Sequence, residues 1–132
     1  MKRKFYIPLI VIVLGLLIFC LWPKTNVTGR EGAQLIFVYG DQNIHTALSQ
    51  EEAARVSDIL DGHFCDLFPG EPACGFSENV SLKVDGCTFA PASDCCNLVM
   101  ELTTGRYFHL PEEDMDYLHE LFRQYGGDFP CV

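Results

Sequence analysis

The chain has 132 residues, and its nine basic and eighteen acidic residues give a formal net charge of −9 at pH 7. Three of the basic residues lie in the first four positions, so the chain beyond residue 22 carries six basic and eighteen acidic residues, a net charge of −12. Such a surface repels phosphate backbones and anionic lipid headgroups, and we therefore expect no nucleic-acid partner.

The most distinctive segment is residues 5–22, FYIPLIVIVLGLLIFCLW, which contains no charge. As a helix it would rise about 27 Å, close to the roughly 30 Å hydrocarbon core of a bilayer. The basic residues Lys2, Arg3 and Lys4 precede it, which favours a cytoplasmic N-terminus, and the ring of Trp22 suits the outer interface. The sequence thus predicts a single-pass protein of the cell membrane with its domain outside; the alternative is an atypical, cleaved signal peptide.

This interpretation divides the chain into four parts. We expect a cytoplasmic basic tip over residues 1–4, a transmembrane signal anchor over 5–22, a polar tether over 23–32 and an extracytoplasmic acidic domain over 33–132. The last part is long enough for one domain and not for two.

The first half of the domain contains a predicted strand and a predicted helix. Residues 34–39, QLIFVY, form an apolar run rich in β-formers between two glycines, which predicts a buried strand. Ser49 and Glu52 have the spacing of a capping box, and apolar residues then recur on one helical stripe. We therefore predict a helix from about 50 to 61, ended by Gly62.

The sequence predicts two hairpins in the second half of the domain. Residues 80–84 alternate as a half-buried strand does, and Asp85-Gly86 favours a type I′ turn into a return strand. Leu98, Met100 and Leu102 alternate again before a three-residue turn that ends at Gly105. This register would place Met100 opposite Phe108 and keep one face apolar.

Pro111 and the four acidic residues after it predict the start of a second helix, which Gly126-Gly127 ends. The element order is then β-α-β-β-β-β-α. We predict an α+β domain with an antiparallel meander and two helices packed on one face.

Six cysteines lie beyond residue 22, and an even number in a small exported domain predicts disulfide bonds. Their connectivity stays open among fifteen arrangements; a bridge across the short loop from Cys65 to Cys74 is our first expectation. We also expect an ordered C-terminal tail bonded through Cys131, with Cys96 or Cys65 as its partner. The competing interpretation is a metal bound by thiolates. The six residues are Cys65, Cys74, Cys87, Cys95, Cys96 and Cys131.

The sequence has no catalytic motif and no Gly-rich phosphate loop, so we expect neither a cofactor nor a defined active site. His109 and His119 would meet where the last strand joins the last helix, but a zinc site there lacks two further ligands. A Cys95–His109 dyad requires that the Cys95 thiol be unbonded. Asn26 and Asn79 fit the glycan acceptor pattern.

Two classes of function remain. The first is a membrane-tethered binding, inhibitory or accessory module that acts through its acidic surface on a basic protein or peptide. The alternative is a small exported enzyme that depends on a thiol or on a metal ion. The absence of a catalytic motif favours the binding module.

Overall fold

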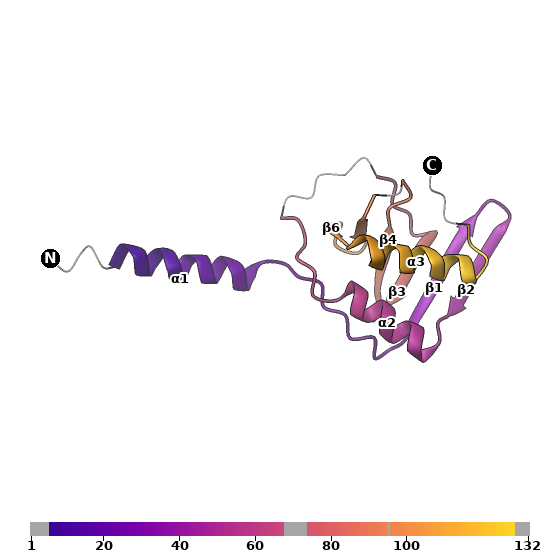
Figure 1. Cartoon of the computed structure of the whole chain (residues 1–132), viewed down its shortest axis with the longest axis horizontal. Coiled ribbons are helices and arrows are strands. Elements are labelled where there is room, and N and C mark those ends of the chain that lie inside the picture. The colour runs from indigo at the N-terminus through magenta and orange to yellow at the C-terminus, as the bar shows by residue number, and fades with distance from the viewer. Residues whose placement is uncertain (1–5, 68–73, 95, 129–132) are drawn as a thin grey trace.

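The protein is an α+β domain in which two helices cover one face of a six-stranded antiparallel sheet (Figure 1). A computed structural model of the chain describes residues 6–67, 74–94 and 96–128. The helices are α1 (Tyr6–Leu21), α2 (Gln50–Leu60) and α3 (Glu112–Gln124). The strands are β1 (Ala33–Tyr39), β2 (Gln42–Ala47), β3 (Val80–Val84), β4 (Cys87–Pro91), β5 (Leu98–Glu101) and β6 (Arg106–His109).

The strands lie in the order β2-β1-β3-β4-β5-β6, and every neighbouring pair is antiparallel. The sequence analysis missed β2, which forms a hairpin with β1. The turn of this hairpin is Gly40-Asp41, where Gly40 has a positive φ of 58°, a conformation that glycine adopts without steric cost. The Asp85-Gly86 turn also has positive φ at both positions, as a type I′ turn requires.

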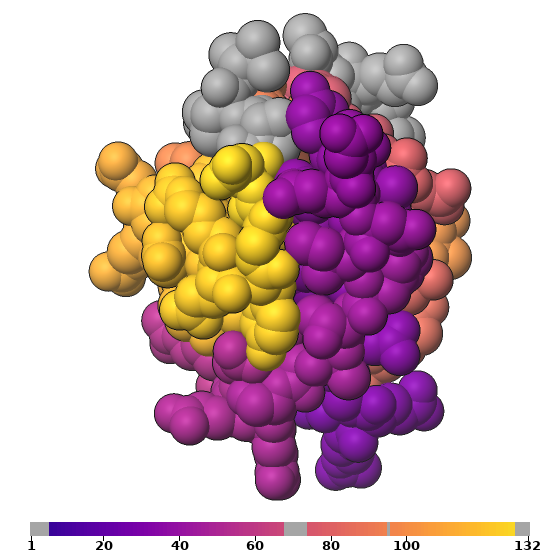
Figure 2. All heavy atoms as spheres, turned by 90° about the vertical axis from the view of Figure 1, so that its right-hand side faces the viewer, coloured from indigo at the N-terminus to yellow at the C-terminus, as the bar shows by residue number. Residues whose placement is uncertain are grey.

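The hydrophobic core lies between the sheet and the helices. Alternate residues of β1, Leu35 and Phe37, are fully buried, and the Phe37 ring lies 6.1 Å from that of Phe122 in α3. Beyond α3 the chain turns back, and Gly127 lies so close to Phe37 that an added Cβ would approach its ring to 2.8 Å. Figure 2 shows the β1–β2 hairpin beside the C-terminal end of α3, where the Gln42 amide donates to the Gly126 carbonyl at 2.6 Å.

The predicted register of the last hairpin is wrong by one residue. Phe108 pairs with Val99, and Met100 pairs with Tyr107. The turn contains four residues, 102–105, so Leu102 lies in the loop and Val99 faces the core. Leu98, Val99 and Met100 are all apolar, and period-two alternation therefore could not identify the buried face.

The prediction of a transmembrane anchor is contradicted. In the part of the chain that the structure describes, no helix combines the length and the apolar character that crossing a membrane demands. α1 has 16 residues and rises about 24 Å, short of the roughly 30 Å hydrocarbon core. The predicted single-pass localisation with the domain outside the cell membrane is therefore not supported, and Lys2, Arg3 and Lys4 lie outside the described residues.

Trp22 has a different role from the interfacial one predicted for it. Its indole Nε1 donates to the Cys65 carbonyl at 3.0 Å, and Lys24 forms a β-bridge with Phe64. The Lys24 amine also lies 4.4 Å from the centre of the Phe64 ring. These contacts join the end of α1 to the domain.

The predicted disulfides are also contradicted. Among the described cysteines none lies at bonding distance from another: Cys20, Cys65, Cys74, Cys87 and Cys96 are free. Cys65 is buried in the core and is not bonded to Cys74, so the loop closure that we expected between them is absent. Cys95 and Cys131 lie outside the described residues, and so does the disulfide that we expected Cys131 to form.

Residues 23–32, expected to form a tether, run along the domain and bury Thr25 and Val27. The Asp85 carboxylate holds this segment. It accepts the backbone N–H groups of Thr28 (2.6 Å), Gly29 (2.9 Å) and Glu31 (3.3 Å) and the Thr28 hydroxyl (2.8 Å). These hydrogen bonds lower the pKa of Asp85 to about 2.

The predicted capping box of α2 is present. Ser49 Oγ accepts the Glu52 N–H, and Glu52 Oε2 accepts the Ser49 N–H at 2.9 Å. The same Glu52 oxygen accepts the Tyr125 hydroxyl at 2.7 Å, just beyond the end of α3. One carboxylate therefore caps α2 and joins it to α3, and these hydrogen bonds lower the pKa of Glu52.

We predict that Ser49→Ala lowers the free energy of unfolding by about 1 kcal/mol, because the first turn of α2 loses its side-chain acceptor. Urea denaturation of the full chain measures the change. Ser49→Asp is the matched control, since a carboxylate also accepts at the N-cap, and it should retain most of the stability. Equal loss in both variants would contradict the capping role.

Asp85 predicts a pH dependence of stability. Its pKa in the folded chain, about 2, lies below the usual value of about 3.9. The stabilisation is therefore complete above about pH 4 and disappears as the pH falls towards 2. Asp85→Asn keeps the positive-φ turn but should show a lower melting temperature at pH 7 and a flatter profile between pH 4 and 2. Asp41→Asn, in the other two-residue turn, should match the wild type.

Candidate functional site

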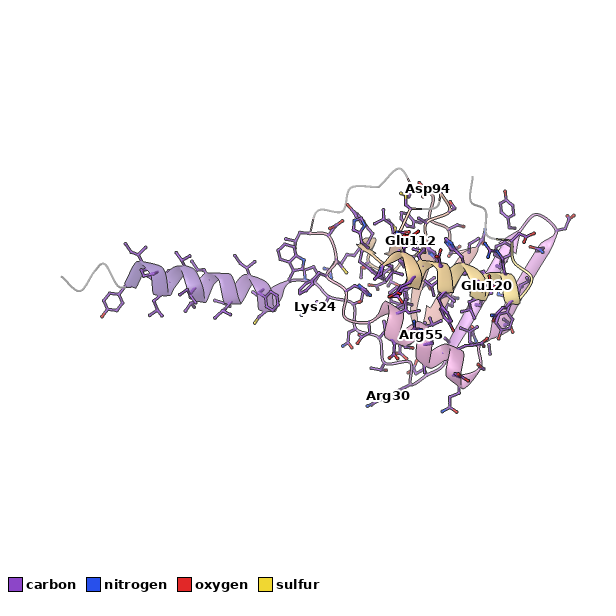
Figure 3. All side chains as sticks on the ribbon, in the orientation of Figure 1. Lys24, Arg30, Arg55, Asp94, Glu112 and Glu120 are labelled. Carbon is purple, nitrogen blue, oxygen red and sulfur yellow. The ribbon has the colours of Figure 1, made fainter. Side chains whose placement is uncertain are left out.

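The strongest concentration of chemically active side chains is formed by Cys74, Asp94 and Cys96, here called the thiol–carboxylate cluster. One potential ligand atom from each residue lies within 4.8 Å of the other two, and both cysteines are half-buried. Cys74 precedes β3, whereas Asp94 and Cys96 belong to the loop between β4 and β5. Figure 3 shows Asp94 at the upper edge of the domain in this view, with Arg55 of α2 well below it.

Two hydrogen bonds hold these loops together. The Ser93 N–H and hydroxyl both donate to the Gly75 carbonyl, at 2.9 and 3.0 Å. Within the second loop, the Cys96 N–H donates to Asp94 Oδ1 at 3.2 Å. A cavity of about 320 Å³ adjoins the cluster: the residues that line this cavity include Gly75 and Ser93, the sequence neighbours of Cys74 and Asp94.

The electrostatics of the cluster keep the proton of Cys74 on its sulfur. The hydrogen bond with Cys96, burial and the nearby Asp94 carboxylate raise the pKa of Cys74 to about 12. The thiol of Cys96, and then that of Cys74, lowers the pKa of Asp94 by hydrogen bonding to the carboxylate. A neutral thiol is a poor nucleophile, so this arrangement disfavours covalent catalysis by Cys74.

The other described cysteines lie elsewhere. Burial raises the pKa of Cys65 in the core, and also that of Cys87, which lies on β4 near Glu101. Cys20 is exposed on α1. Of the cysteines that the sequence analysis singled out, the structure thus brings Cys74 and Cys96 together.

The histidines do not form the zinc site that the sequence analysis considered. His109 pairs with Leu98 on the sheet face opposite the core, whereas His119 belongs to α3, which covers the other face. His63 has a structural role: its ring stacks on Phe108 at 5.1 Å, and its Nε2 lies 2.6 Å from the Ile59 carbonyl. The Cys95–His109 dyad involves a residue outside the described part of the chain.

A second candidate surface is the helical face, defined as the exposed sides of α2 and α3. The two helices carry eight carboxylates and two arginines, a net charge of −6. The six strands together carry one lysine, one glutamate and one arginine. Figure 3 shows Glu112 and Glu120 on α3 and Arg55 on α2, both helices lying in front of the sheet.

Part of this charge is already paired. Arg55 lies 3.6 Å from Asp114, and Arg123 lies 2.9 Å from Glu120. The remaining exposed acids of the helical face form no salt bridge with another described residue. These acids are Glu51, Asp58, Glu112, Glu113 and Asp116.

A groove of about 470 Å³ runs between the two helices. Glu51, Glu52 and Asp58 line one side of it, and the Tyr117 ring provides an aromatic surface. The Arg55 guanidinium lies 5.5 Å from the centre of this ring, a cation–π geometry. The groove thus combines carboxylates with an aromatic ring, the two groups that bind arginine and lysine side chains.

Comparison with models of known protein families, with curated protein sequences and with solved structures finds no match to this chain.

The raised pKa of Cys74 predicts slow alkylation. At pH 7.5 its thiol should react with iodoacetamide more slowly than that of exposed Cys20, because the thiolate is the reacting form. Asp94→Asn removes a negative charge beside the sulfur and should speed the reaction. Peptide mass spectrometry of the alkylated chain measures both rates. Equal rates at Cys74 and Cys20 would contradict the described electrostatics.

Proposed function

We propose that the protein is a non-catalytic binding module that uses the helical face to bind a basic protein or peptide, as an inhibitory or accessory partner. The observation that carries the proposal is the difference in charge between the two helices and the sheet that they cover; the loops and turns beyond residue 22 carry the remaining net charge of −7. The two helices have a net charge of −6, while the six strands have a net charge of +1. A charged face of this kind steers the encounter with an oppositely charged partner and fixes its orientation.

The groove between α2 and α3 supports a peptide rather than a small inorganic cation as the ligand. Its lining combines carboxylates with the ring of Tyr117, and its volume of about 470 Å³ accommodates one or two long side chains. An arginine of the partner would bind the unpaired acids at the rim and stack on aromatic surface in the same groove. If the surface were acidic for solubility alone, a basic peptide would bind with no preference for the helical face.

The proposal is tested by titrating the full chain with a fluorescent Lys/Arg-rich peptide at low and at high salt. Binding should weaken as salt screens the charges. A triple variant, Glu51→Gln with Asp58→Asn in the groove and Glu113→Gln on α3, should weaken binding about tenfold, since each exposed charge pair that is lost costs about 0.2–1 kcal/mol. Melting curves recorded by circular dichroism check that the variant is folded.

The matched control removes the same charge away from the helices. Glu31→Gln with Asp41→Asn and Glu78→Gln changes three exposed acids that lie in loops and turns. This variant should bind the peptide nearly as tightly as the wild type. If both triple variants weaken binding equally, the attraction depends on net charge and not on the helical face, and the proposal is wrong.

A further inference from the structure

The thiol–carboxylate cluster has the spacing of a metal site. The ligand atoms of Cys74, Asp94 and Cys96 all lie within 4.8 Å of one another. Two thiolates bound to one tetrahedral Zn²⁺ at about 2.3 Å lie about 3.8 Å apart. The three groups therefore need to move by no more than about an ångström to share an ion, which a change of side-chain rotamer provides.

Hydrogen bonds join the described parts of the two loops that carry the cluster. The two hydrogen bonds from Ser93 to the Gly75 carbonyl join the loop of Cys74 to that of Asp94. Gly75 allows this approach, because a Cβ at that position would lie 2.5 Å from Ser93 Oγ. The bond from the Cys96 N–H to Asp94 Oδ1 orients the carboxylate. Hydrogen bonds that already bring the ligand residues together lower the cost of binding an ion.

The donor set selects the class of ion. Calcium and magnesium require six or more oxygen ligands, whereas two sulfurs and one carboxylate oxygen suit borderline and soft cations. We propose that Cys74, Asp94 and Cys96 bind one divalent cation of the zinc class, with a fourth coordination position left to solvent or to an external ligand. Binding displaces the thiol protons into water, the sulfurs stay reduced, and no electron is transferred.

This inference is independent of the helical face, and its test uses a different readout. The full chain is purified under reducing, oxygen-free conditions, loaded with Zn²⁺, desalted and weighed by native mass spectrometry. We expect one Zn²⁺ per chain, retained in a large excess of Mg²⁺ or Ca²⁺. Replacement by Co²⁺ should give the thiolate-to-cobalt charge-transfer absorption that oxygen-only sites lack.

The variants identify the ligands. Cys96→Ser and Asp94→Asn should each weaken Zn²⁺ binding at least tenfold, since loss even of a supporting hydrogen bond costs about 10–100-fold. Cys20→Ser, at an exposed thiol of α1, should bind as tightly as the wild type. Asp94→Asn preserves the size and shape of an exposed-loop side chain, so it tests the site even where a cysteine variant fails to fold.

Three results would overturn the proposal. The first is a chain that retains no Zn²⁺ under reducing conditions. The second is equal Zn²⁺ affinity in the wild type and in Asp94→Asn and Cys96→Ser. The third is a cobalt complex without thiolate charge-transfer absorption, which would place the ion on carboxylates elsewhere on this acidic chain.

Discussion

The arrangement of the molecule depends on the burial of one face of the sheet against α2 and α3. Phe37 lies at the centre of this contact, between the ring of Phe122 and the backbone of Gly127. Because the apolar stripe of each helix is buried there, the polar residues of both helices face outward on the same side of the domain. The helical face is therefore acidic as a consequence of core packing together with the composition of the two helices.

Features with local causes could be predicted from the sequence. The capping box of Ser49 and Glu52 and the Asp85-Gly86 turn each depend on residues within four positions, and both are present. β2 was missed although its turn, Gly40-Asp41, is also a hairpin signal, because Gln42–Ala47 contains a single large apolar residue, Ile44. The register of β5 was wrong because three successive apolar residues fit either face of a strand.

The thiol–carboxylate cluster could not be predicted in the same way. Cys74 and Cys96 are separated along the chain by two strands, and the bonds between Ser93 and Gly75 bring them together. Counting cysteines led to disulfides, since an even number in an exported domain favours them, while the described thiols are free. The apolar run likewise suggested an anchor from its length in the sequence, but within the described residues its helix runs from Tyr6 to Leu21, 16 residues, and does not have the length that spanning a membrane demands.

The strand order also determines how the chain reaches this structure. Four of the five strand pairings join consecutive strands, and hairpins of this kind form within about 1–10 μs. The pairing of β1 with β3 is the exception, since it joins Phe37 to Val80 and encloses the whole of β2 and α2. Closing that loop costs conformational entropy, and the contacts of the early hairpins do not offset this cost. The slow step of folding should therefore be the docking of two preformed halves along β1, with α2 shortening the loop between them.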